Sequence, residues 1–535
     1  MRWPLFRQPA GAAAALRSGR RAVRAGTDGA LDALHPLILL LRGLSRLTLL
    51  ALRWWSRAPK DRRGPALFGA AVAVMVVALL PWGPVFGVAL LVGAAAWQGR
   101  EGAGAVRAAR EEAENSRLQA VYEALVPCFA LHDDPDPDPV YAHDGAWERA
   151  FEEAEFGDDG RIARLLVRYP AHFADGEPEH RLAVERRLAA KCGTDREYRF
   201  VWDAEHNRLE VSVPPALPQG IAAQRYVTGP GEIVLGFTDA EAVLRRVPVT
   251  DGGRARDVPP VVWRTGARSA QAHLLVAGVP GAGASTLLRS VVLQALQDGD
   301  VLVVEGGGSG EFAALTGREG VLAVETSAAG AVTSLEWAVH ETERRLSEAS
   351  RARQAGHAVP DDVRRPLWIV LDRPAALIHL ARMELRRDLR ELLEVPLRHG
   401  RAAQVTVAVA EHTECTDVLG PVVGSHTRAR VLLGAAAPGE ARAVLGEAVA
   451  PPPGPGAEPG RGFARLGTEP VLRMQVPATP DPLDDSAPEA ERQAVLGLLP
   501  PPAAPETRAL SGQARRADGT QAPSLIKSPR PPAGS

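Results

Sequence analysis

Lysine is almost absent from this chain of 535 residues. Its lysines are Lys60, Lys191 and Lys527, so arginine supplies nearly all of the basic charge. This preference is typical of a GC-rich genome and is not by itself a sign of nucleic-acid binding. The formal net charge of −2 hides an asymmetry, because residues 1–63 are strongly basic and contain few acids.

Cysteine is equally scarce. Cys128, Cys192 and Cys415 lie far apart, and no two of them form a CxxC pair. This spacing excludes a zinc ribbon and a disulfide framework, and it favours a reducing, cytoplasmic setting.

Charged residues are missing altogether from residues 66–97. The run exceeds the roughly 20 residues that one helix needs to cross a bilayer, and Pro81 to Pro84 interrupt it midway. We predict a transmembrane hairpin over 64–99, with one kinked helix or a buried soluble helix pair as the alternatives. Arginines flank both ends, so the positive-inside rule places both ends in the cytoplasm and predicts a multi-pass protein of the cell membrane.

The basic region 1–63 contains an apolar segment at 31–55 that arginines interrupt. Arg42, Arg46 and Arg53 fall near one helical face, opposite a row of leucines. This pattern predicts an amphipathic helix on an anionic membrane surface, and an ordinary packed surface helix is the alternative.

Two further regions flank the main domain. We predict that residues 100–227 hold a cytoplasmic linker helix and a small α+β module, with a helix at 179–191 and strands at 199–202 and 209–213. The acidic, proline-rich stretch 133–138 is expected to be a solvated loop rather than a metal site. Residues 481–535 are rich in proline and are predicted to be a disordered tail.

Residues 228–480 alternate strand-like and helix-like runs, which predicts an α/β domain with a mostly parallel sheet. The apolar run 273–277 precedes a glycine-rich loop, and a largely apolar helix follows at 287–296. Strand, glycine loop and helix are the context of a Walker A phosphate loop. The predicted nucleotide-binding residues are Gly278, Gly281, Gly283, Ala284, Ser285 and Thr286. A glycine-rich loop of no function is the alternative.

The loop has every element of GxxxxGK[ST] except the lysine, because Ala284 stands in its place. The apolar run 367–372 ends in Asp372 and reads as a Walker B strand, or else as a core strand that merely ends in an acid. Ser285 and Asp372 are the predicted ligands of Mg²⁺. Arg373 follows where a glutamate would activate the attacking water, and arginine cannot act as a general base. No residue is therefore predicted to be catalytic.

Six segments between residues 230 and 475 resemble the FtsK/SpoIIIE family of DNA translocases. They are the strand 273–278, the strand 301–305, the helix 335–345 with its Trp337 and paired arginines, the strand 367–372, the turn 398–403 and Thr427-Arg428. The resemblance implies a RecA-like P-loop NTPase fold that binds ATP and Mg²⁺ and assembles as a hexamer on double-stranded DNA. It also makes Arg428 a candidate inter-subunit arginine. The chain departs from the family at Ala284, Arg373 and Glu411.

Two functions follow from these observations. The first is a membrane-anchored, DNA-binding and nucleotide-binding component of a translocation or segregation apparatus, with impaired ATP hydrolysis. The second is a non-catalytic scaffold that joins an active paralogue in a hetero-oligomer. A small-molecule kinase is disfavoured because the phosphate-loop lysine is missing. Four arginines of the stretch 382–390 either face a DNA channel or pair with the acids that alternate with them.

Overall fold

The computed structural model describes residues 107–131, 139–193, 196–449 and 459–503, together with isolated positions between 68 and 75. The chain divides into two compact units. One unit comprises the chain up to Ala120 with Phe156–Arg161, and the other comprises the remaining residues.

Two predicted segments of the N-terminal region lie outside the described residues. They are the amphipathic helix at 31–55 and nearly all of the hairpin at 64–99. In the part of the chain that the structure does describe, no helix combines the length and the apolar character needed to cross a bilayer.

The first unit contains the beginning of a helix that runs over residues 107–129. On this helix, Arg110 donates a hydrogen bond to the carbonyl oxygen of Gly157 at 3.1 Å and pairs with Glu114 at 2.8 Å. Arg117 donates to the carbonyl oxygen of Gly160. The two arginines thus hold the chain around residues 157–160 against the helix.

The second unit begins with the small α+β module that the sequence predicts. Its elements are β1 (Phe151–Phe156), β2 (Ile162–Arg168), α4 (Pro178–Cys192), β3 (Arg199–Asp203) and β4 (Arg208–Ser212). The sheet order is β1-β2-β4-β3, and β4 is antiparallel to both of its neighbours. Leu182, Val184 and Leu188 form the buried side of α4, which begins with proline in its first turn, where a missing N–H costs nothing.

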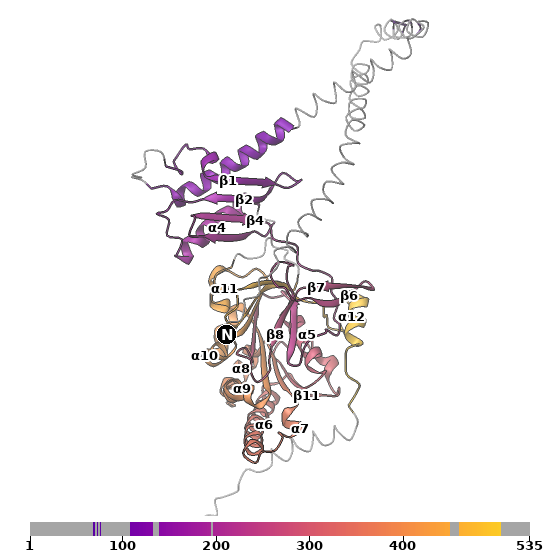
Figure 1. The fold of residues 1–535 in the computed structure, drawn as a ribbon. Helices are drawn as coiled ribbons and strands as arrows, with labels where there is room; N and C mark the ends of the chain where they lie inside the picture. Colours follow the sequence, from indigo (N-terminus) through magenta and orange to yellow (C-terminus); the bar gives the residue numbers. More distant parts are fainter. Residues whose placement is uncertain are drawn as a thin grey trace, which may run out of the picture. The chain divides into compact units, whose positions relative to one another are not determined.

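The rest of the second unit is the P-loop domain (Figure 1). Its strands are β5 (Glu232–Phe237), β6 (Val247–Asp251), β7 (Arg254–Val258), β8 (Pro260–Arg264), β9 (Leu274–Gly278), β10 (Asp300–Glu305), β11 (Val321–Glu325), β12 (Leu367–Asp372), β13 (Val405–His412), β14 (Ala429–Leu433), β15 (Arg461–Leu466) and β16 (Leu472–Gln475). Its α-helices are α5 (Ala284–Ala295), α6 (Ala328–Gln354), α7 (Asp361–Arg364), α8 (Pro374–Met383), α9 (Leu389–Ala403), α10 (Gly420–His426), α11 (Pro438–Leu445) and α12 (Glu489–Leu496), and a 3₁₀ turn, η3, spans Thr413–Leu419.

The central sheet has the strand order β11-β10-β12-β13-β9-β14-β15-β16-β5-β8. From β11 to β14 the neighbouring strands are parallel. The strands β15, β16, β5 and β8 add antiparallel pairs. This mixed, mostly parallel sheet with helices on its faces fits the predicted RecA-like P-loop NTPase fold. One strand, β13, lies between the phosphate-loop strand β9 and the acid-bearing strand β12.

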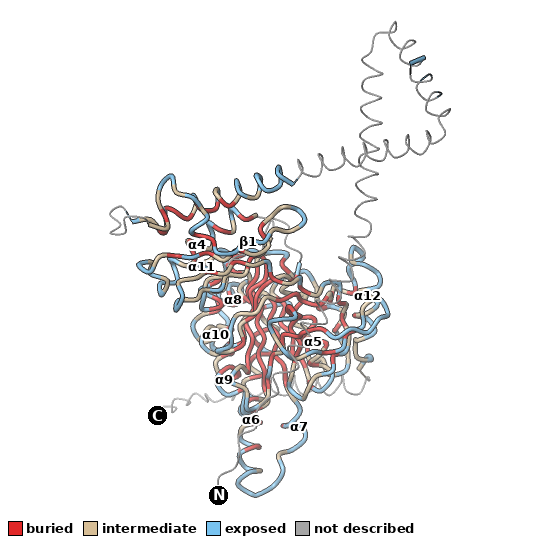
Figure 2. The backbone as a smooth tube through the Cα atoms, turned by 45° about the horizontal axis from the view of Figure 1, so that its top comes forward, coloured by how far each residue is buried: buried red, intermediate tan, exposed pale blue. Residues whose placement is uncertain are grey.

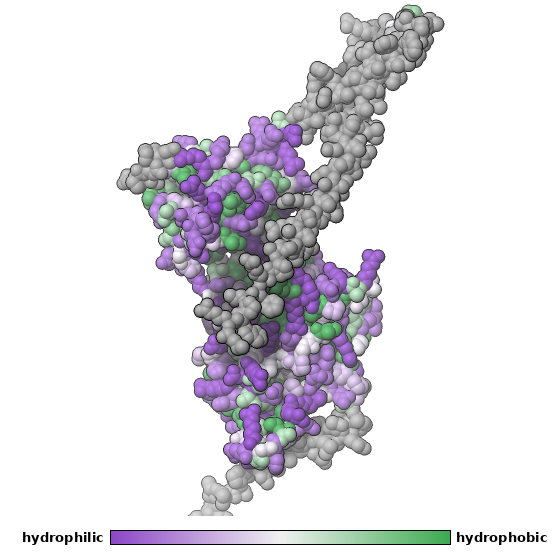
Figure 3. All heavy atoms as spheres, viewed as in Figure 1, coloured by the Kyte–Doolittle hydropathy of each residue, from purple (hydrophilic) through white to green (hydrophobic). Residues whose placement is uncertain are grey.

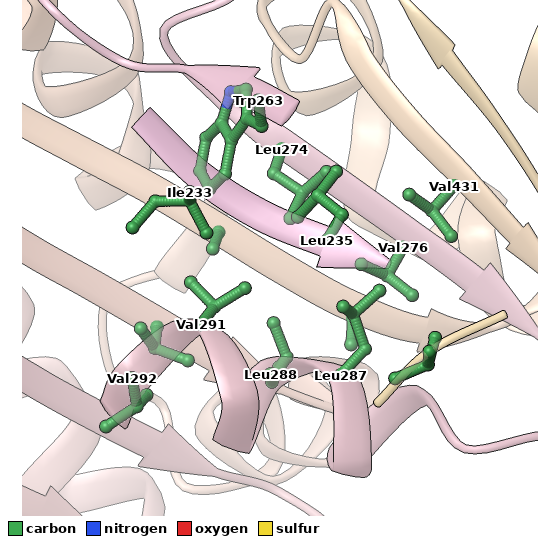
Figure 4. Packing of buried hydrophobic residues seen from close by; sticks show 14 of the residues in the cluster. Ile233, Leu235, Trp263, Leu274, Val276, Leu287, Leu288, Val291, Val292 and Val431 are labelled. Atoms are coloured by element: carbon green, nitrogen blue, oxygen red, sulfur yellow. The ribbon is translucent and has the colours of Figure 1, made fainter. Parts of the chain in front are cut away.

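Helices cover both faces of the parallel half of the sheet. Leu274 and Val276 of β9 pack on one face against Leu287, Leu288 and Val291 of α5 (Figure 4). The alternate strand residues point to the other face, where α6, α8, α9 and α10 pack on them. Buried positions run along these strands (Figure 2). Burial on both faces is why β9, β12 and β13 read as continuous apolar runs in the sequence.

The outer surface contrasts with this core. On the face drawn in Figure 3, hydrophilic residues dominate the P-loop domain, and apolar residues are scattered among them. The apolar residues that fix the fold are thus in the two layers between sheet and helices.

The predicted disorder from residue 481 onward is wrong for residues 481–503. Helix α12 forms within this stretch, and its Val495 is fully buried against Ala223 and Leu293. Proline is confined to the borders of the helix, at Pro488 and beyond residue 499, where it does not interrupt helical hydrogen bonds.

The prolines after α12 also take part in the fold. The carbonyl oxygen of Pro501 accepts a hydrogen bond from the N–H of Glu319 at 2.9 Å, and the N–H of Ala503 donates to Gly317 at 2.9 Å. The backbone of a proline can accept a hydrogen bond but cannot donate one. Proline therefore suits a position such as 501, where only the carbonyl oxygen is bonded. Residues beyond 503 lie outside the described part.

Candidate functional site: a phosphate loop with an altered nucleotide centre

The loop between β9 and α5 has the backbone conformation of a phosphate loop. Gly278 ends β9, and α5 begins at Ala284. Gly281 and Gly283 have φ angles of 79° and 96°, a region that side chains avoid. A Cβ on Gly283 would lie 3.0 Å from the N atom of Gly460, whereas one on Gly281 would meet no described atom within 4 Å. Both glycines serve the turn, and Gly283 also permits a close backbone approach.

The start of α5 leaves backbone donors for a ligand. Among the described residues no side chain caps this helix, and its first N–H groups, including those of Ser285 and Thr286, have no partner one turn earlier. Such a terminus attracts anions. Ala284 packs its methyl group against the apolar core. The loop therefore keeps its backbone cradle and lacks a charged side chain.

Ser285 and Asp372, the predicted Mg²⁺ ligands, lie next to each other. The Ser285 hydroxyl lies 3.0 Å from Oδ2 and 3.2 Å from Oδ1 of Asp372, within hydrogen-bond distance of both. Asp372 ends β12, one strand beyond β13, so the two residues reach each other across the carboxyl edge of the sheet. A hydroxyl beside a carboxylate is the donor pair that holds Mg²⁺ at phosphates in P-loop proteins, so these residues fit a Mg²⁺–nucleotide.

Asp372 is fully buried, and burial raises the pKa of its carboxyl to about 6. The guanidinium of Arg373 and the hydrogen bond from Ser285 oppose this shift.

Arg373 occupies the position after the Walker B acid in a left-handed conformation, with φ of 50°. Its Nε lies 3.6 Å from Oδ2 of Asp372, and its Nη2 donates to Ser309 Oγ at 2.9 Å. The same nitrogen lies 3.4 Å from Glu311 Oε1. A cation thus lies beside the Ser285–Asp372 pair, at the position where a glutamate would activate the attacking water.

The structure adds three charged residues that the sequence did not single out as site residues. Glu305 is fully buried at the end of β10, in register with Asp372. Arg289 is buried on α5, where it pairs with Glu311 and donates to the Thr479 carbonyl oxygen at 2.7 Å. In the sequence, Arg289 is noticeable only as a charged residue within a largely apolar helix. Glu311 lies in a glycine-rich loop and gave no signal.

Glu411, the third departure from the family, has a structural role. Its Oε2 accepts the N–H of Ala375 at 2.8 Å, and its Oε1 accepts the N–H of His412 at 2.9 Å. Burial raises the pKa of this carboxyl, and the two N–H groups counteract the rise. Glu411 thus holds the beginning of α8, next to Arg373.

Arg428 does not join the phosphate site of its own chain. It directly precedes β14, and β14 runs parallel to β9, so Arg428 lies at the amino edge of the sheet while the phosphate loop lies at the carboxyl edge. Its side chain is exposed.

Three of the arginines considered for a DNA channel form ion pairs. Arg386 pairs with Glu384, Arg387 with Glu336 at 3.2 Å, and Arg390 with Asp388. These pairs agree with the interpretation of the stretch as a salt-bridged surface.

A pocket of about 220 Å³ opens beside the phosphate loop. Gly283 and Thr286 line one side, and residues 475–480 line another. The pocket adjoins the first turn of α5 through Gly283 and Thr286.

No family model matches this chain, and no curated protein matches it. Solved structures do resemble it. The monomeric pCW3 conjugation coupling protein TcpA with ATPγS is 15% identical, with a TM-score of 0.42, over 72% of this chain and 99% of that one. The cytoplasmic domain of the type VII secretion ATPase EccC of Thermomonospora curvata is 22% identical, with a TM-score of 0.39. That match covers 54% of this chain and 33% of EccC.

A third neighbour is EssC (ATPases 2 and 3) of Geobacillus thermodenitrificans, which is 14% identical with a TM-score of 0.40. That match covers 53% of this chain and 52% of the other. These neighbours are P-loop ATPases of the FtsK/SpoIIIE type, the family that the sequence resembles. All three TM-scores lie below 0.5, so the fold assignment stands on the chain's own strand order and phosphate loop.

Proposed function

We propose that this chain is a nucleotide-binding subunit of an FtsK/SpoIIIE-like translocation apparatus, of the kind that serves DNA transfer, segregation or secretion, and that its ATP hydrolysis is impaired. One observation carries the proposal. The phosphate cradle and the Ser285–Asp372 pair are intact, while Ala284 and Arg373 occupy the two positions where catalysis needs a lysine and a glutamate.

Nucleotide binding is supported by the donors that remain. The uncapped turn at Ser285 and Thr286 offers N–H groups to a phosphate, and the helix adds partial positive charge. When Mg²⁺ accompanies the nucleotide, it neutralises phosphate charge, and Ser285 and Asp372 would hold it. The adjoining pocket of about 220 Å³ is the proposed site of the nucleoside part.

Weak hydrolysis is supported by what surrounds the reacting phosphate. Arg373 cannot accept a proton from water. Glu411 is the one acidic residue of β13, and both of its carboxylate oxygens accept backbone N–H groups. Glu305 Oε1 accepts the N–H of Gly310 at 2.6 Å and so orients the loop after β10.

Double-stranded DNA, the membrane and other subunits are the proposed partners. The DNA and the hexamer come from the family resemblance, and the membrane from the uncharged run 66–97. Arg428 is exposed and remote from its own phosphate loop, which suits a residue that acts on a neighbouring subunit. Leu380, Met383 and Leu385 are exposed around the end of α8, which suits a subunit contact.

A second function, a scaffold that joins an active paralogue in a hetero-oligomer, draws on the same altered positions. It differs from the first in predicting that nucleotide turnover plays no part.

The deciding experiment is ATP turnover by the purified chain, with and without duplex DNA. We expect turnover near background, and we expect the Ala284→Lys/Arg373→Glu double variant to raise it at least tenfold, because it supplies both missing groups. Asp372→Asn added to this double variant should abolish the gain. DNA-stimulated turnover in the unaltered chain that disappears in Asp372→Asn would instead identify an active motor.

A further inference from the structure

Arg373 directly follows Asp372 and places a positive charge close to the phosphate loop. A polyphosphate brings several negative charges to a site whose loop has lost its lysine at position 284. Among the residues that the structure describes, Arg289 and Arg373 place their guanidinium groups near that loop. Arg289 is 4% exposed, and it is held by Glu311, by the Thr479 carbonyl oxygen and by the ring of Phe312 at 5.6 Å. Arg289 therefore has a structural role.

The side chain of Arg373 is less buried than that of Arg289, and one of its hydrogen-bond donors has no partner in the part of the chain that the structure describes. Its Nε is buried and has no hydrogen-bond partner among the described residues. Its side chain is 24% exposed and lines a pocket of about 620 Å³ at the carboxyl edge of the sheet. A ligand that enters this edge can therefore reach the guanidinium.

The guanidinium is also close to the phosphate site. Oδ2 of Asp372 lies 3.6 Å from Arg373 Nε and 3.0 Å from Ser285 Oγ. The arginine and the predicted Mg²⁺ ligand of the phosphate loop thus approach the same carboxylate oxygen. Asp372 and Glu311 balance the positive charge of Arg373 in the structure, and Glu411 lies near enough to interact with it.

The loop after β10 is shaped to admit this side chain. A Cβ on Gly307 would lie 1.9 Å from Arg373 Nη2, and one on Gly306 would lie 2.1 Å from the Arg373 carbonyl oxygen. Any side chain at either glycine would displace Arg373. The loop and the arginine side chain therefore fit each other. Such a fit is not expected if Arg373 merely replaces a glutamate and has no role of its own.

We propose that Arg373 supplies the positive charge to the β- and γ-phosphates that the phosphate loop lacks. This inference rests on the proposed nucleotide binding, and it names the residue that compensates for the missing lysine. Phosphate oxygens would accept hydrogen bonds from this guanidinium, since a planar guanidinium binds phosphate through two parallel hydrogen bonds. The charge then reaches the phosphates from the end of β12 rather than from the loop.

The test measures the affinity of the purified full-length chain for ATPγS, ADP and AMP by titration calorimetry. We expect Arg373→Gln to weaken ATPγS and ADP binding at least tenfold and to change AMP binding little, because charge-assisted hydrogen bonds to the outer phosphates are lost. Gly307→Ala should weaken polyphosphate binding in the same way without removing a charge. Arg398→Gln, an exposed arginine on α9, is the matched control.

A second variant, which restores a positive charge at position 284, gives a more specific test than the loss of affinity alone. Adding Ala284→Lys to Arg373→Gln should recover most of the lost ATPγS affinity, because the charge returns from the loop side. The inference is overturned if Arg373→Gln binds ATPγS like the unaltered chain, or if it loses AMP and ATPγS affinity equally. If the unaltered chain binds none of the three nucleotides, the proposed function itself fails, which is a distinct result.

Discussion

A buried carboxylate next to a guanidinium experiences two opposing effects, and Asp372 is such a group. Burial dominates, so its pKa is about 6 in the folded chain, against 3.8 for an ordinary aspartate. The folded state then holds a proton between these values that the unfolded state releases. The stabilising contribution is complete below about pH 4 and is lost as the pH rises towards 6, an effect on the order of 3 kcal/mol.

We therefore expect Asp372→Asn to remove this pH dependence. Its free energy of unfolding, measured by denaturant titration without nucleotide or Mg²⁺, should increase relative to the unaltered chain as the pH rises from 4 to 6.5. Asp298→Asn, at an exposed position after α5, should leave the profile unchanged. A constant difference between Asp372→Asn and the unaltered chain across this range would show that Asp372 does not hold a proton there.

Residues of the candidate site differ in how far the sequence reveals them. Asp372 and Ser285 could be located from the sequence because Asp372 ends a strongly patterned strand and Ser285 lies in the first turn of a largely apolar helix. Arg289 and Glu311 could not, because their pairing brings a helix and a loop together in space and leaves no local pattern. The role of Arg373 was also hidden, since the sequence shows a missing glutamate but not the glycine loop that receives the guanidinium.

Elements with strong apolar patterns were predicted well. The strand at 367–372 has the predicted bounds, and the helix predicted at 179–191 lies within α4. Composition failed at α12, where neighbouring prolines and alanines suggested disorder. A short helix that buries a single valine has too weak a pattern to outweigh its proline-rich surroundings, and only its contact with α5 identifies it.

The attachment of α12 makes a prediction at the level of elements. Val495 is fully buried, so Val495→Ala should lower the free energy of unfolding by about 1–2 kcal/mol through lost burial and a residual cavity. The adjacent Leu496 is 38% exposed, so Leu496→Ala should cost clearly less. Denaturant titration of both variants provides the measurement. Equal costs would mean that α12 does not pack on α5 in solution.

At the scale of the whole molecule, the chain combines a P-loop domain with a strongly basic N-terminal region and an uncharged run at 66–97. Such a run, with arginines on both flanks, is stable in a bilayer if it turns back at Pro81 to Pro84 and leaves the charges on one side. The phosphate loop would then face the cytoplasm, where ATP is available. We propose that the segment 31–55, predicted to be amphipathic, adds a second, weaker attachment that depends on anionic lipids.

Membrane fractionation distinguishes the two attachments. We expect the full chain to stay with membranes after alkaline carbonate extraction, because a hairpin in the hydrocarbon core is not held by charge. A chain without residues 1–63 should stay there as well, whereas a chain without residues 1–99 should be released. If removing residues 1–63 alone releases the chain, the surface helix is the anchor and the run 66–97 does not span the bilayer. If the chain without residues 1–63 is retained, reactivity of a cysteine placed at Gly83 towards a membrane-impermeant reagent decides on which side of the membrane the turn lies.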